Sequence, residues 1–533
     1  MRRWQRLLVL GGLAVVTTQD PLASAREEAS ALVPGDVREG PIAGGEGHAF
    51  RVTVAGAPLL VAVEQRGIDL VVVDRPVAGG GEPVEVDAPN RRFGPELLVV
   101  EAAGEHLVEV RSRDAAAAPG RFELRLELLA GEGPDGARRR MAAAAMTRGS
   151  RSPAAWTLEA LRSSLAAYRE ALEGWRALCD RPLEAEALVA IADREYRLGE
   201  RRAAVDDRDR ALALWRDLGA ARREADTLDL LGQALLKLGE SGPARTAIAD
   251  SLAIWRRLGE RLEEATTLVD VGLVEHTSGA LAAALPPYEQ ARAILQSLGA
   301  RREEARVLNN LGGLYDLMGE PDAALADYQQ ALTLRRALGD RPLEAQTLTN
   351  VAVIHRTLGD WQAALDDYDQ ARAILAPLHE PDKKAALLNN VGFLYNAVGE
   401  PRRALALFEE ALQLERAVGD RQGEVIARNN LGLTWRAAGD LDRALDQQRQ
   451  ALAQAAALGD SWLLAVTRLR LAETRMERGD PAALADIAAT LEPLDQAGDR
   501  RLEAEALHLE GRALARAGRP EEALGPLRQA LAR

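Results

Sequence analysis

The sequence predicts a multi-domain chain in which a small antiparallel β-sandwich is followed by an all-α superhelical solenoid. Between about residues 47 and 129, apolar and polar residues alternate with a period of two, which is typical of half-buried strands. From about residue 155, glycines return every 40 residues just after apolar helical stretches, which indicates a repeated pair of helices. The 533 residues give enough chain for both parts.

The first 25 residues differ from the rest of the chain. Arg2, Arg3 and Arg6 precede the apolar run "LLVLGGLAVV", and "ASA" ends at Ala25. This order of charge, apolar core and small residues predicts a signal peptide over residues 1–25, and therefore export to the periplasm or the extracellular space. Because a span needs about 20 apolar residues, membrane attachment is expected only if this signal stays uncleaved.

Residues 33–130 are predicted to form the β-sandwich. The run "GRFELRLELL" places Phe122, Leu124, Leu126 and Leu128 on one face of a strand. Similar short runs are separated by turns such as "AGGGEP". The acids of this region, Asp69, Asp74 and Asp87, follow no spaced calcium-loop pattern and are expected on the solvated surface.

The order of these strands resembles the bacterial pre-peptidase C-terminal type of β-sandwich. The similarity rests on "FRV", "QRGIDLVV", "PELLV", "GEHLVEV" and "PGRFELRL" in that order. Members of that family are accessory modules of exported enzymes, so the resemblance implies an auxiliary role in a bacterial protein. Residues 131–153 follow, rich in Gly, Pro, Arg and Ala, and are predicted to be a linker with one short helix.

Residues 155–533 are predicted to form about nine 40-residue helical hairpins after a leading helix. One repeat has a pattern that a second copy shares at equivalent places: Leu308, Leu311, Gly312, Tyr315, Ala324, Tyr328 and Ala331. This pattern resembles the tetratricopeptide repeat, in the long form seen in kinesin light chains. Cys179 stands where later repeats have a glycine and is expected in a turn, while the recurrence of Trp175, Trp215 and Trp255 favours packing between repeats.

Several kinds of chemistry are excluded by the sequence. A net charge of −14 and few aromatic residues argue against nucleic acid as a partner. No lysine follows a glycine, so a nucleotide-binding P-loop is missing, and neither a G-x-S-x-G nor an H-E-x-x-H pattern occurs. The single cysteine excludes a thiolate metal cluster. We therefore predict no catalytic residue, no metal and no cofactor.

Asparagines interrupt the first helices of four consecutive repeats, although asparagine is disfavoured in helix interiors. The resemblance implies that first helices line a concave surface, where an asparagine contacts an extended ligand. An amide suits this role because it both donates to and accepts from a peptide backbone. The predicted peptide-binding groove consists of these residues: Asn310, Asn350, Asn390, Asn430, Arg356, Asn396 and Arg436.

The alternative is that the asparagines join one repeat to the next. This alternative stays open for the Asn310 series and is the favoured interpretation for Asn309, Asn389 and Asn429. The groove residues lack the lysines of the carboxylate clamp seen in some chaperone-binding relatives, which argues against specificity for a C-terminal peptide.

The sequence thus predicts an exported, non-catalytic scaffold that binds a protein or peptide on the concave face between residues 301 and 440. An alternative comes from the domain order, which resembles the front half of bacterial CHAT proteins. Their caspase-like cysteine peptidase domain is missing from this sequence. Under that hypothesis the chain is the substrate-recruiting part of a longer peptidase, and the intact mass of the endogenous protein would distinguish the two.

Overall fold

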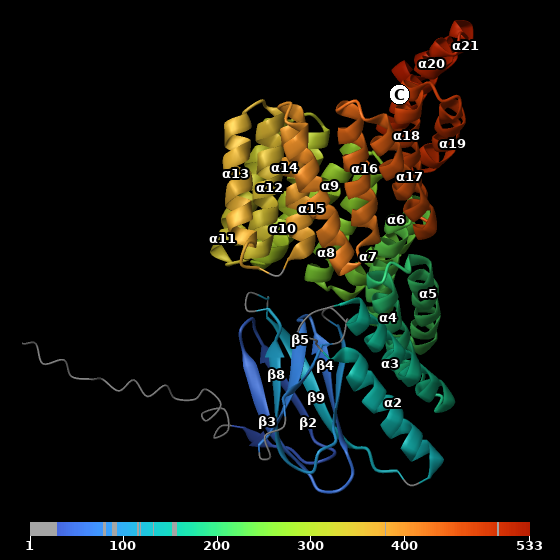
Figure 1. The fold of residues 1–533 in the computed structure, drawn as a ribbon. Helices are drawn as coiled ribbons and strands as arrows, with labels where there is room; N and C mark the ends of the chain where they lie inside the picture. The colour runs from blue at the N-terminus through green and yellow to red at the C-terminus, as the bar shows by residue number, and fades with distance from the viewer. Residues whose placement is uncertain are drawn as a thin grey trace, which may run out of the picture.

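The computed structural model describes residues 29–77, 82–87, 93–114, 117, 119–131, 133–151, 157–378, 380–497 and 500–532. The predicted signal peptide, residues 1–25, lies outside them. Within this part of the chain, two β-sheets precede twenty helices that coil as a solenoid above the sandwich (Figure 1). The fold class predicted from the two periodicities is confirmed.

The sandwich consists of a five-stranded sheet with the order β1-β3-β8-β5-β6 and a four-stranded sheet with the order β2-β9-β4-β7. All pairings are antiparallel except the two-residue contact between β1 and β3. The strands are β1 (Ser30–Ala31), β2 (Val37–Ile42), β3 (Gly47–Val54), β4 (Leu59–Arg66), β5 (Leu70–Pro76), β6 (Val84–Val86), β7 (Phe93–Val100), β8 (Gly104–Ser112) and β9 (Gly120–Leu128).

The alternation along β9 places Phe122, Leu124 and Leu126 in the buried core between the sheets, as predicted. Leu128 was predicted on the same face, but it is 48% exposed because the strand ends there and leaves the core. On the opposite face Glu123 is only 6% exposed, which alternation alone does not explain. Its burial has a tertiary cause: arginines from β4 and β9 cover it.

Two of the acids expected on the solvated surface are buried instead. Asp74 lies 2.9 Å from Nδ1 of His106, and Asp87 lies 2.7 Å from Arg113. Burial raises the pKa of both carboxyl groups, while the partner cations oppose the rise. Each acid therefore makes a structural pair within the sandwich. Among the described residues, no cluster of three or more His, Cys, Asp or Glu side chains could hold a metal ion.

The predicted linker at residues 131–153 is instead, over most of its length, the helix α2 (Pro134–Ser150). Its small residues Ala142 and Ala145 are buried against both the outer face of the four-stranded sheet and α3. The hydroxyl of Thr147 accepts a hydrogen bond of 2.9 Å from the backbone N–H of Val99 on β7. The alanine run that suggested a linker thus allows a close approach of helix to sheet, and α2 joins the two domains.

After α3, eighteen helices form nine antiparallel hairpins, in agreement with the predicted repeat number. The helices are α3 (Leu158–Ala177), α4 (Arg181–Arg197), α5 (Arg201–Leu218), α6 (Ala221–Lys237), α7 (Ser241–Leu258), α8 (Arg261–Thr277), α9 (Leu281–Leu298), α10 (Arg301–Leu317), α11 (Pro321–Ala337), α12 (Arg341–Thr357), α13 (Trp361–Leu375), α14 (Pro381–Ala397), α15 (Pro401–Val418), α16 (Arg421–Ala437), α17 (Leu441–Leu458), α18 (Ser461–Arg478), α19 (Ala482–Ala497), α20 (Arg500–Arg516) and α21 (Pro520–Ala532).

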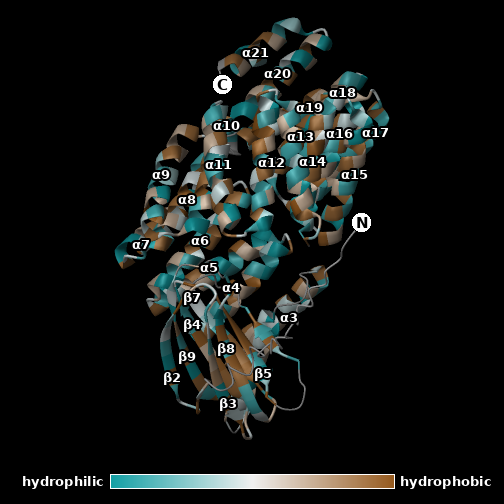
Figure 2. Cartoon of the chain, turned by 90° about the vertical axis from the view of Figure 1, so that its left-hand side faces the viewer, coloured by the Kyte–Doolittle hydropathy of each residue, from teal (hydrophilic) through white to brown (hydrophobic). Residues whose placement is uncertain are grey.

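The helices end where the glycine period predicts. Gly219, for example, has a φ of 66°, a left-handed conformation that costs glycine little and closes the last helical turn. Cys179 takes the same conformation, with a φ of 55°, and is exposed, so the thiol sits in a turn as expected. Each helix carries apolar and polar residues on different faces (Figure 2), and the apolar faces pack between neighbouring helices.

Candidate functional site: the inner face of the solenoid

The first helix of each hairpin belongs to the inner layer of the solenoid. From α6 to α20, consecutive first helices contact one another across every repeat boundary, whereas consecutive second helices make no comparable contact. A curved stack is tighter on its concave side, so the first helices form the concave face. The predicted groove residues all lie on four of these helices: α10, α12, α14 and α16.

Amide side chains join neighbouring inner helices. The Nδ2 of Asn350 donates a 3.1 Å hydrogen bond to Oδ1 of Asn309, and Asn430 donates a 3.0 Å bond to Asn389 in the same way. Both bonds cross a repeat boundary. The bridging alternative therefore describes these two pairs, and it leaves the carboxamide oxygens of Asn350 and Asn430 as the atoms that could accept from a ligand.

Two more amides bridge repeats through threonine hydroxyls. Asn429 donates a 2.9 Å bond to Thr467, and Asn396 donates a 2.8 Å bond to Thr434. Asn429 was expected in such a role, whereas Asn396 was predicted in the groove. Since Asn396 remains half-buried rather than fully enclosed, its groove contact stays a prediction.

The remaining groove candidates are partly open. Asn310 and Arg356 are half-buried, and Asn390 donates 3.0 Å to the carbonyl of Ala386 within its own helix. Arg436 lies 2.7 Å from Glu473 on α18, so an inter-repeat ion pair already engages it. The structure thus places all seven predicted residues on the inner layer, with Asn310, Arg356 and Asn390 the least tied to a neighbouring repeat.

Two buried charges between repeats were not found from the sequence. Arg335 is 3% exposed and donates to the hydroxyl of Thr347 and, over 2.6 Å, to the carbonyl of Leu343. Burial lowers the pKa of Arg335 to about 10. The repeat position that holds Trp215 and Trp255 in earlier copies holds this arginine here, and that replacement is the signal that could have identified it.

The second charge, Glu415, occupies the same repeat position and is 5% exposed. Burial raises the pKa of Glu415 to about 8, and the nearby acids Asp420, Asp382 and Glu424 raise it further. Gly423 faces this carboxyl group so closely that a Cβ there would collide with it. The glycine in helix α16 therefore makes room for a buried acid at the boundary between two repeats.

The solenoid closes on itself after one superhelical turn. Arg201 at the start of α5 donates a 2.7 Å hydrogen bond to Oε1 of Gln422 on α16 and lies 3.9 Å from Asp460. A Cβ on Gly419 would meet the side chain of Leu158, which shows how closely α3 approaches the turn after α15. In Figure 1, α6 and α7 accordingly lie beside α16 and α17. The inner face around residues 301–440 is therefore part of a ring rather than an open arc.

No helix in the described part of the chain is long and apolar enough to cross a membrane.

Three segments of the chain, residues 223–297, 303–376 and 383–457, match the family model described as tetratricopeptide repeat. The solenoid thus carries tetratricopeptide repeats over these segments, as the glycine and leucine pattern predicted. The match covers α10, α12, α14 and α16, the helices that hold the candidate groove. No curated protein matches the chain.

Solved structures with a similar solenoid include three bacterial or bacterial-type proteins. BtubC from P. vanneervenii is 23% identical, with a TM-score of 0.34 over 40% of this chain and 90% of its own. A Rap protein complexed with competence and sporulation factor is 18% identical, with a TM-score of 0.46 over 63% and 96%. The apo form of the quorum sensor NprR from B. thuringiensis is 14% identical, with a TM-score of 0.42 over 64% and 98%.

Proposed function

We propose that this protein is an exported, non-catalytic scaffold that binds an extended protein or peptide segment on the inner face of its solenoid. The observation that carries the proposal is the row of half-buried polar side chains on consecutive inner helices, with Asn310, Arg356 and Asn390 as its most available members. An extended segment presents N–H and C=O groups at regular intervals, which carboxamides on successive helices can pair with.

The amide bridges between repeats support this proposal. Hydrogen bonds such as the one from Asn350 to Asn309 fix the side chains in one orientation. A fixed amide loses little conformational freedom when a ligand arrives, so less of the binding free energy is spent on ordering it. The same bonds hold the inner helices in register, so bridging and ligand contact are compatible roles for one side chain.

Export and a bacterial origin belong to the proposal through the character of residues 1–25 and the family resemblance of the sandwich. Expression of the full gene in a bacterial host with fractionation and N-terminal sequencing tests this part. We expect recovery outside the cytoplasm, with a new N-terminus close to residue 26 if the signal is cleaved. Recovery of the intact chain in the cytoplasm alone would contradict it.

The groove is tested by peptide selection. A library of random extended peptides displayed on phage is enriched on the full chain and counter-selected on the triple variant N310A/R356A/N390A. We expect peptides that lose at least about tenfold in affinity with the triple variant, equal to about 1.4 kcal/mol. The matched control is Q329A/Q370A, which removes exposed side chains from the outer helices α11 and α13 and leaves binding unchanged. Peptides indifferent to the triple variant would contradict the proposal.

A further inference from the structure

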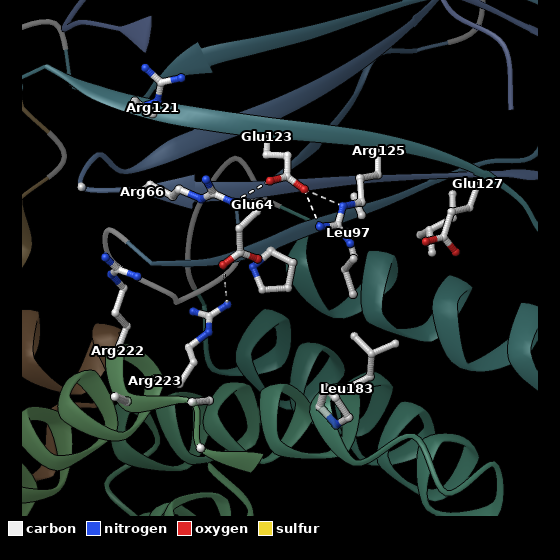
Figure 3. Close-up of a pocket in the computed structure, with 18 of the residues that line it drawn as sticks. Glu64, Arg66, Leu97, Arg121, Glu123, Arg125, Glu127, Leu183, Arg222 and Arg223 are labelled. Carbon is white, nitrogen blue, oxygen red and sulfur yellow. Dashed lines mark hydrogen bonds and ion pairs between the residues drawn. The ribbon is translucent and has the colours of Figure 1, made fainter. Parts of the chain in front are cut away.

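A second cavity lies away from the inner face, between the sandwich and the solenoid. This interdomain cleft of about 1080 Å³ is formed by the outer face of β4, β7 and β9 on one side and by the starts of α4, α6 and α8 on the other. Figure 3 shows Arg222 and Arg223 extending from the helices toward the strands that carry Glu64, Arg66 and Glu123. A ligand in the interdomain cleft would touch both domains at once.

The sheet side of the interdomain cleft presents guanidinium groups above a buried acid. Glu123, with a side chain only 7% exposed, lies 2.5 Å from Arg66 and 2.5 Å from Arg125. The side chains of Arg66 and Arg125 are 47% and 61% exposed. One carboxylate shared by two cations leaves positive charge at the surface, and each guanidinium keeps N–H donors that the carboxylate does not use.

The same polarity continues around the interdomain cleft. Arg121 is 58% exposed, and its partner Glu39 lies 3.8 Å away, beyond hydrogen-bond distance. On the helix side Arg222 is 54% exposed and pairs with Glu260 at 2.7 Å. The lining holds six arginines against four glutamates, although the chain as a whole carries a net charge of −14. The cleft is therefore a locally basic region on an acidic protein.

Apolar side chains lie between these charges. Leu97 on β7 and Leu60 on β4 face outward from the sheet, and Leu183 near the start of α4 lines the opposite wall. The volume reaches the upper end of the range of about 300–1000 Å³ that is usual for small-molecule sites. An acidic peptide segment with an apolar side chain matches both the size of the cleft and its mixture of arginines and leucines.

We propose that the interdomain cleft binds an acidic peptide segment whose carboxylates pair with Arg66, Arg121 and Arg222 and whose apolar side chain packs against Leu97 and Leu183. Guanidinium groups suit carboxylates because the two can form paired, charge-assisted hydrogen bonds. This site is independent of the inner face of the solenoid, because the interdomain cleft lies outside that face, at the outer edges of the first repeats.

Fluorescence anisotropy with the full-length chain tests the proposal. The probe is a fluorescein-labelled peptide of about twelve residues built from glutamate and leucine, and its uncharged counterpart carries glutamine for every glutamate. The cleft variant is R66Q/R121Q/R222Q. The matched control, R210Q/R372Q/R403Q, removes the same charge from exposed arginines that pair with acids on outer helices.

We expect the acidic peptide to bind the unsubstituted chain, to weaken at least tenfold with the cleft variant, and to keep its affinity with the control. Affinity should also fall as salt rises, because ion pairs are screened. The groove variant N310A/R356A/N390A should bind the peptide as the unsubstituted chain does. Three results would each overturn the proposal: no binding to the unsubstituted chain, equal loss with cleft and control variants, or equal affinity for the glutamine peptide. Circular dichroism confirms that each variant is folded.

Discussion

The early and the middle repeats fill the same boundary position with opposite chemistry. In the first copies the second helix places Trp175, Trp215 and Trp255 between repeats, all at most 3% exposed. In later copies the equivalent position holds Arg335 and Glu415, which are equally buried. The helical framework is the same in both regions, so the repeat geometry does not require an apolar residue at this position.

The difference teaches where the solenoid relies on area and where it relies on directed bonds. Tryptophan stabilises a boundary through the large apolar area it buries, which is insensitive to small changes of angle. Arg335 and the amide pairs depend on hydrogen bonds with fixed distances, so they determine orientation more than stability. These polar boundaries lie among the helices that carry the candidate groove, where the orientation of side chains decides binding.

The largest expected effect is on a tryptophan boundary. Trp255→Ala should lower the free energy of opening of α7 and α8 by about 3–5 kcal/mol, because a buried cavity forms and Asp229 loses the 3.0 Å bond from the indole N–H. Native-state hydrogen exchange measures this locally. The matched control Trp361→Ala removes a ring that is 41% exposed and should cost far less. Equal small effects for both would break the comparison.

The next effect is on pH dependence at an acidic boundary. Since burial raises the pKa of Glu415 from its ordinary 4.5 to about 8, the folded chain holds a proton there that the unfolded chain has already released. The free energy of unfolding should therefore fall as the pH rises from about 4.5 to 8, by at most about 1.4 kcal/mol per pH unit. Thermal unfolding across this range measures the slope.

Glu415→Gln should remove that part of the pH dependence and raise stability at pH 8, where the wild-type carboxylate is buried and charged. Glu410→Gln, at an exposed position of the same helix α15, provides the control and should leave the slope unchanged. A slope that persists in Glu415→Gln would assign it to other groups.

A smaller effect is expected for the amide bridges. Removing the Asn350 to Asn309 bond by Asn350→Ala should cost about 1 kcal/mol, the usual net value of a partly buried hydrogen bond. A double-mutant cycle with Asn309→Ala isolates the pair and should give a coupling energy of about 0.5–1 kcal/mol. Asn390→Ala, which loses only a bond within its own helix, serves as the reference. Zero coupling would mean that the two amides do not hold the repeats together.

The smallest effect concerns closure of the ring. Arg201→Ala should remove the contacts to Gln422 and Asp460 at a cost of less than about 1 kcal/mol, because a single polar contact joins surfaces that other residues also hold. Labels placed on α5 and α16 for distance measurement by electron paramagnetic resonance should show a broader distribution in the variant. An unchanged distribution would assign closure to other contacts, such as Leu158 against the turn at Gly419.

Local features of the molecule could be predicted from the sequence because they depend on neighbouring residues. The left-handed ends at glycines such as Gly219 follow from backbone sterics, and the burial of Trp255 follows from its recurrence at the repeat period. The turn at Cys179 was predicted in the same way. These properties are decided within one repeat or between two adjacent ones.

Features that depend on distant parts of the chain were missed. Closure at Arg201 results from many small rotations between repeats, which no local pattern reveals. The burial of Glu123 results from covering arginines on β4 and β9, and α2 was mistaken for a linker because its alanines form no clear apolar face until the sheet and α3 are both present. For the groove, the sequence located the inner helices but not the pairing of Asn350 with Asn309 across repeats.

The most direct test of the account is photo-crosslinking from the inner face in the source cells. p-Benzoylphenylalanine replaces Arg356 on the inner helix α12 in one strain and Gln370, exposed on the outer helix α13, in another. Mass spectrometry then identifies the crosslinked peptides. We predict that position 356 captures one defined protein segment and that position 370 does not. Capture of that segment only from position 370, or no crosslink from position 356, would contradict a binding role for the inner face.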